Sequence, residues 1–134
     1  MTALPNKVDA ITLFVESLDE SKAFYSDVFG IAVLFEDQNS AVFKFDGFLI
    51  NLLKVPAART LIAPEAVARP DAGSRFQFTI PVANVDETCK QLEARGVTLL
   101  NGPMDRPWGI RTASFKDPGG HIWEVAHPLK TAKD

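Results

Sequence analysis

Several residue types that catalytic and secreted proteins depend on are scarce in this chain of 134 residues. Its one cysteine, Cys89, excludes an internal disulfide framework and is typical of a reducing compartment. No apolar run approaches the length of a membrane span. The first residues have neither a cationic start nor the apolar core of a signal peptide. We therefore expect a cytoplasmic protein that makes no contact with a membrane.

Motifs for phosphate, nucleic-acid and triad chemistry are also missing. The sequence has no glycine-rich phosphate loop, no CxxC pair, and only two histidines, His121 and His127. The net charge is −3 and no stripe of Lys and Arg stands out, so we expect no nucleic-acid partner. What is abundant is apolar material: 46% of the residues, with 10 Phe. This is enough for the core of one folded domain over 1–134.

The clearest positive feature is an internal repeat. The segment Ile11 to Glu20 (ITLFVESLDE) matches Phe78 to Glu87 (FTIPVANVDE) at a shift of 67 residues, from Ile11 to Phe78. Thr, Val, Asp and Glu recur in the same order in both segments. A repeat of this kind indicates a duplicated folding unit.

The first copy predicts a βαβββ module over about 8–54. Ser17 to Glu20 has the form of a capping box that begins a helix, and Gly30 is placed to end it. Asp46–Gly47 is typical of a tight hairpin turn. The buried stripe of the helix is assigned to Ala23, Phe24, Val28 and Phe29. The predicted strands are Val8–Val15, Ala32–Glu36, Ala41–Phe45 and Phe48–Lys54.

The second copy predicts the same order of elements over about 75–128. Asn84 caps its helix and Gly96 ends it. Residues 55–74 between the modules are rich in Pro, and we interpret them as a linker with one helical turn near Pro64–Val67. The predicted strands are Arg75–Val82, Val97–Leu100, Ile110–Lys116 and His121–His127.

This pattern resembles the vicinal-oxygen-chelate superfamily, also called the glyoxalase/bleomycin-resistance/extradiol-dioxygenase fold. The resemblance implies an α+β protein in which two tandem βαβββ modules form curled mixed sheets around a cup that holds the ligand. It also implies a homodimer. The matching segments are Val15 to Tyr25, Val28 to Gly30, Val85–Asp86, Gly96–Val97 and Phe115 to Glu124.

Metal-dependent members of the superfamily take ligands from the first and last strand of each module. By resemblance these positions are Ala10, Asn51, Gln77 and Glu124. Glu124 is a full ligand for a divalent ion, Gln77 and Asn51 are neutral donors, and Ala10 offers no donor. We therefore expect no cofactor, with Ni, Mn, Zn or Fe bound through Gln77, Glu124 and Asn51 as the alternative. Iron-dependent ring cleavage is disfavoured, because strand alternation places both histidines on the face opposite Glu124.

Two groups of side chains remain as candidates for binding a ligand. Glu124 can serve as a general base or bind an ammonium or amide, or it can be a structural carboxylate bonded to Gln77 or Arg111. Trp108 and Arg111, with Arg106 beside them, can stack on a planar ring and hold a carboxylate. In the alternative, Trp108 only covers the end of a strand.

Two functions follow. The one we favour is a metal-independent protein that binds a small molecule, such as a drug or metabolite, as in the bleomycin-resistance branch. The alternative is a metal-dependent lyase or isomerase of the glyoxalase type, acting on a substrate with vicinal oxygens. An extradiol dioxygenase is the least favoured of the three.

Overall fold

The computed structural model describes residues 3–130 and divides the chain into two compact units, with the boundary between Arg69 and Pro70. Each unit contains one four-stranded sheet. This confirms the α+β class and the two tandem modules. Within residues 3–130, no helix is long and apolar enough to cross a membrane.

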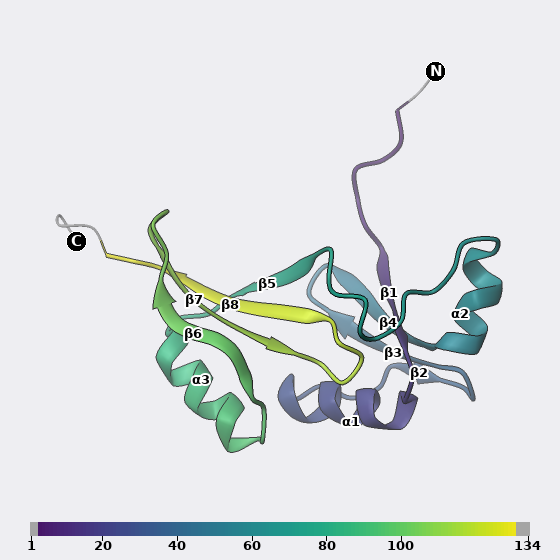
Figure 1. Ribbon diagram of the computed structural model, residues 1–134, viewed down its shortest axis with the longest axis horizontal. Helices are drawn as coiled ribbons and strands as arrows, with labels where there is room; N and C mark the ends of the chain where they lie inside the picture. Colours follow the sequence, from purple (N-terminus) through teal and green to yellow (C-terminus); the bar gives the residue numbers. More distant parts are fainter. Residues whose placement is uncertain (1–2, 131–134) are drawn as a thin grey trace. The chain divides into compact units, whose positions relative to one another are not determined.

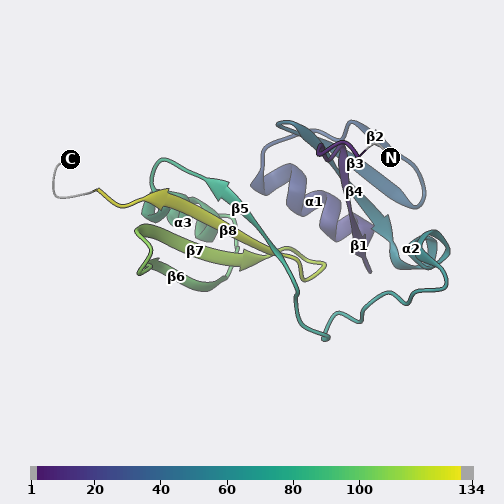
Figure 2. The same cartoon turned by 90° about the horizontal axis from the view of Figure 1, so that it is seen from above.

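The first unit has the strand order β1-β4-β3-β2, with β1 parallel to β4 and the other pairs antiparallel (Figures 1 and 2). A second helix follows β4 where the sequence predicted a linker. Its elements are β1 (Ala10–Val15), α1 (Leu18–Val28), β2 (Phe35–Glu36), β3 (Ser40–Phe45), β4 (Phe48–Lys54) and α2 (Val55–Ile62).

The second unit repeats this topology with the order β5-β8-β7-β6, and β5 is parallel to β8 (Figure 2). The strand β6 begins and ends later than predicted, and it pairs with β7 through irregular register. The elements are β5 (Gln77–Pro81), α3 (Val85–Ala94), β6 (Leu99–Asp105), β7 (Ile110–Lys116) and β8 (Ile122–Pro128).

Both duplicated helices begin as the capping pattern predicts. The Ser17 hydroxyl accepts from the Glu20 backbone N–H at 3.2 Å, and the Asn84 side chain accepts from Glu87 N–H at 3.1 Å. Both helices are followed by glycine in the left-handed region, with φ of 64° at Gly30. Short polar side chains thus satisfy one of the donors that each helix start leaves open.

The predicted buried stripe of α1 was wrong at Ala23, while Phe24, Val28 and Phe29 are half-buried. Ala23 is exposed, whereas Leu18, Ser21 and Tyr25 are buried. The Tyr25 ring packs 5.8 Å from that of Phe43, centroid to centroid, on the sheet beneath. The stripe runs through Tyr25 because its large ring fills the space between helix and sheet, which Ala23 cannot do.

The predicted linker also needs correction. Its first part, Val55–Ile62, forms α2, and the helical turn predicted near Pro64–Val67 is not a helix. Pro56 lies in the first turn of α2, where a missing N–H costs nothing. The proline that suggested a break is therefore part of a helix start.

Each sheet buries one face against its own helix. In the second unit Phe115, Trp123 and Val125 lie on this helix face, and the Trp123 and Phe78 ring centroids are 4.5 Å apart. Because strand residues alternate, Thr79, Glu124 and their neighbours of the same parity lie on the other side. We call this side of each sheet the opposite face.

Gly102 holds β6 close against β7. It has φ of 86°, and a Cβ added there would lie 2.5 Å from the Thr112 carbonyl oxygen and 2.7 Å from the Ala113 Cα. Only glycine fits a left-handed backbone at that distance. This contact also fixes where Thr112 and the end of β6 lie on the sheet.

We predict that Gly102→Ala lowers the free energy of unfolding by about 3 kcal/mol, as left-handed strain of about 1–2 kcal/mol adds to overpacking of about 1–3 kcal/mol. Gly73→Ala is the matched control, since Gly73 has the same φ of 86° and no atom within 4 Å of an added Cβ. It should lose about 1 kcal/mol only. Urea denaturation measures both; equal losses would show that the close approach is unimportant.

Candidate functional site

The parallel pairing of the first and last strands sets the geometry of the candidate site in each unit. Thr12 pairs with Asn51 in the first unit and Thr79 pairs with Glu124 in the second. Thr12 and Thr79 are equivalent in the repeat, so Asn51 and Glu124 occupy equivalent positions. This supports the alignment on which both residues were chosen.

In the second unit Glu124 lies on the opposite face and is held there by its neighbour. The Thr79 hydroxyl donates to Glu124 Oε1 at 3.0 Å. Gln77 lies on the same face, one step along β5, and pairs with Ile122. The structure therefore brings Gln77 and Glu124 together, while Glu124 Oε2 has no hydrogen-bond partner among the described side chains.

Arg106 also lies over this face. Its Nε donates to Thr112 Oγ1 at 2.9 Å, and its Nη2 donates to Asn101 Oδ1 at 3.3 Å. Thr112 is fully buried and has the same parity as Ser114, which pairs with Glu124. The opposite face of the second sheet thus carries both a carboxylate and a guanidinium.

Arg111, which the sequence favoured, lies on the helix face instead. Its Nε and Nη2 donate to Asp86 at 2.9 Å each, and its Nη1 donates to Asp105 at 2.8 Å. The Arg111 hydrogen bond lowers the pKa of Asp86, and the two carboxylates raise the pKa of Arg111. Arg111 fastens α3 to the β6–β7 hairpin and does not contact Glu124.

Trp108 lies in the β6–β7 turn and is 68% exposed. Ser114, the partner of Glu124, is four residues along β7 from Ile110, which is about 13 Å of strand. Trp108 lies beyond that strand end and is not brought together with Glu124. It remains a predicted contact only for a ligand long enough to reach the turn.

In the first unit Asn51 is the residue of interest. Its Oδ1 is buried and accepts no hydrogen bond within the part of the chain that the structure describes. Ala10 lies on the same face, at the start of β1, and is exposed. The opposite face of this sheet therefore presents one unsatisfied amide among largely apolar neighbours.

Both histidines have structural partners. His127 Nδ1 accepts from the Val85 backbone N–H at 2.9 Å, at the start of α3. His121 Nδ1 lies 3.0 Å from Asp117 Oδ1, within the turn between β7 and β8. Neither side chain lies on the face of Glu124.

The superfamily implies a divalent metal at the four predicted ligand positions. Within residues 3–130, no group of three or more His, Cys, Asp or Glu is arranged to hold a metal ion. Glu124 is the one anionic donor at the four predicted positions, and Asn51 and Gln77 are neutral. Ions such as Ni and Zn prefer imidazole or several anionic donors, so this set is a poor fit.

Cys89 does not have the environment of a nucleophile. Its side chain is 2% exposed on α3. Burial raises the pKa of the Cys89 thiol, and the nearby Asp86 and Glu93 raise it further. A buried thiol of this kind contributes to packing.

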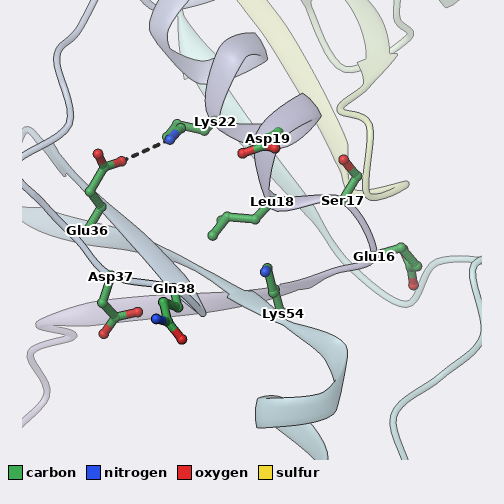
Figure 3. Close-up of a pocket in the computed structure, with 9 residues that line it drawn as sticks. All are labelled: Glu16, Ser17, Leu18, Asp19, Lys22, Glu36, Asp37, Gln38 and Lys54. Carbon is green, nitrogen blue, oxygen red and sulfur yellow. Dashed lines mark hydrogen bonds and ion pairs between the residues drawn. The ribbon is translucent and has the colours of Figure 1, made fainter.

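A separate hollow of about 680 Å³ lies in the first unit (Figure 3). Lys22 closes one side through its ion pair with Glu36 at 3.0 Å. None of the predicted site residues lines it, and its charges are mixed. The lining residues are Glu16, Ser17, Leu18, Asp19, Lys22, Glu36, Asp37, Gln38 and Lys54.

The sequence of this chain is similar to those of known proteins. A sequence model described as the Glyoxalase/Bleomycin resistance protein/Dioxygenase superfamily matches residues 7–125. The Uncharacterized protein YraH of Bacillus subtilis is 30% identical over 123 residues, covering 89% of this chain and 96% of that protein. The chain therefore belongs to the glyoxalase/bleomycin-resistance/dioxygenase superfamily, as the resemblance implied.

Solved structures with this fold carry names that indicate different functions. A glyoxalase/bleomycin resistance protein/dioxygenase from Nocardioides has a TM-score of 0.86 at 23% identity, covering 98% of this chain and 89% of its own. Lactoylglutathione lyase from Agrobacterium tumefaciens has a TM-score of 0.68 at 23% identity, covering 92% and 94%. TnmS3, an antibiotic binding protein from Streptomyces, has 0.70 at 22%, covering 95% and 99%. These likenesses show the fold alone.

The ion pair of Arg111 gives a pH-dependent prediction. Because the pKa of Asp86 is lowered on folding, its stabilising effect is present at neutral pH and is lost as the pH falls through the lowered value. We expect Asp86→Asn to lower the melting temperature by a few degrees at neutral pH and by progressively less as the pH falls below the ordinary Asp pKa of about 3.9. Glu87→Gln, in the same helical turn, is the control; a pH-independent deficit in Asp86→Asn would contradict the assignment.

Proposed function

We propose that this protein binds a small organic molecule on the opposite face of a sheet and that this binding needs no metal. The observation that carries the proposal is Asn51, whose buried Oδ1 lacks a partner. An unsatisfied buried acceptor costs about 1–3 kcal/mol, which a donor on a ligand would offset. Glu124, at the equivalent position of the second unit, offers a further acceptor.

The available side chains favour binding over catalysis. Both histidines and Arg111 are occupied by structural partners, and Cys89 is buried. Glu124 is left as the candidate for a general base. The name of TnmS3, an antibiotic binding protein of the same fold, supports a binding role, whereas the name of the lyase supports catalysis.

The alternative function is a metal-dependent lyase or isomerase of the glyoxalase type. One observation favours it: Gln77 and Glu124 share a face at neighbouring register positions. The neutral donors count against it. A dioxygenase is less favoured still, since neither histidine shares the face of Glu124. We retain the homodimer as part of the proposal, to be tested by light scattering of the purified chain.

Asn51→Leu tests the binding role of the orphaned acceptor. We expect the ligand-free protein to keep or gain stability, by about 1 kcal/mol, because an unsatisfied acceptor is replaced by an apolar group of similar size. Compounds found in a thermal-shift screen should bind the variant at least about 10-fold more weakly, the loss of one hydrogen bond of about 1.4 kcal/mol. If Asn51→Leu loses stability but binds these compounds normally, the Asn51 amide has a structural role and does not bind the ligand.

Metal titration separates the two functions. After dialysis against a chelator, we expect Ni, Mn, Zn and Fe(II) to leave the melting temperature unchanged, since Glu124 is the one anionic donor of the set. Glu124→Gln should still weaken ligand binding, while Glu93→Gln on the surface of α3 should not. One bound ion per chain, whose removal lowers the melting temperature, would favour the lyase.

A further inference from the structure

Arg106 is placed on the second sheet by its backbone and by its side chain. The Arg106 N–H donates to Ile110 O at 2.7 Å, and its carbonyl accepts from Gly109 N–H at 3.1 Å, which closes the β6–β7 turn. The side chain then runs back over the sheet to Thr112. Its position is therefore fixed before any ligand arrives.

The guanidinium of Arg106 has spare donors. A guanidinium carries five N–H groups, and those of Arg106 that bond to Thr112 and Asn101 use two of them. No described carboxylate lies within ion-pair distance of Arg106, whereas Arg111, five residues on, is paired with both Asp86 and Asp105. A charge held in place without an acidic partner is suited to an anionic ligand group.

Register relates Thr112, the residue that anchors Arg106, to Glu124. Thr112 pairs with Ala126 and Ser114 pairs with Glu124, so Thr112 and Glu124 are diagonal neighbours on one face. Such neighbours lie about 7–8 Å apart. One face of the second sheet therefore carries a positive and a negative group on neighbouring strands.

Resting on the proposed function, we infer that the ligand of the second unit is dipolar. Its carboxylate binds Arg106, and its amine or amide N–H binds Glu124 beside Thr79. A neutral drug-like compound uses Glu124 alone.

The test is an NMR titration of the intact protein with glycyl-L-phenylalanine, its C-terminal amide, its N-acetyl derivative and free phenylalanine. We expect the dipeptide and free phenylalanine, which carry both charges, to bind at least 10-fold more tightly than the amide and the N-acetyl derivative. Arg106→Gln should weaken dipeptide binding at least 10-fold and leave the amide unchanged. Glu124→Gln should weaken the dipeptide and leave the N-acetyl derivative unchanged.

Two controls keep a loss of fold apart from a loss of contact. Arg95→Gln removes the same charge at the end of α3 and should bind normally. Thr112→Val keeps the charge but releases the Arg106 Nε, and it should weaken the dipeptide several-fold. If Arg106→Gln weakens dipeptide and amide equally, or the dipeptide does not bind at all, the dipolar ligand is wrong.

Failure of the dipeptide does not decide the proposed function. If other compounds from the thermal-shift screen bind and depend on Glu124 or Asn51, the binding function is supported and the dipolar ligand class is wrong. If no compound binds the parent protein, the binding function and the ligand class are both wrong. Binding of the dipeptide that survives Glu124→Gln would overturn the pairing of amine and carboxylate.

Discussion

The parallel pairing of first and last strand is the constraint on which both units depend. It joins residues 39 positions apart in the first unit (Thr12 to Asn51) and 45 apart in the second (Thr79 to Glu124), and the middle strands pair antiparallel. Because the register is fixed, Thr12 faces Asn51 and Thr79 faces Glu124. The helix covers one side, so any binding group must come from the other. The candidate site follows from topology before any chemistry is considered.

Much of this could be predicted from the sequence. The repeat located both modules, the capping residues Ser17 and Asn84 located both helices, and strand alternation separated Glu124 from the histidines. These features rest on local rules that act over a few residues. The superfamily followed from the spacing of its motifs. Which small molecule is bound does not follow from any of them.

The sequence predictions were wrong where contacts between residues distant in the chain decide the structure. Pro56 suggested a break, yet it lies in the first turn of a helix. Arg111 looked available until Asp86, from another element, was found to hold it. Arg106 was named only beside Trp108 and Arg111, because the irregular pairing of β6 decides which arginine reaches the face of Glu124, and the sequence does not show that pairing. The hydroxyl of Thr79 gave no signal of its own, although its place in the repeat, opposite the last strand, could have found it.

The split between a packed side and a free side has an evolutionary consequence. Ala10 is exposed and lies outside the helix-side core, so a longer polar side chain there would leave that core in place. Asn51 is different, because its Oδ1 is buried and a charge there would be costly. The free side can therefore change its chemistry most easily at its exposed edge.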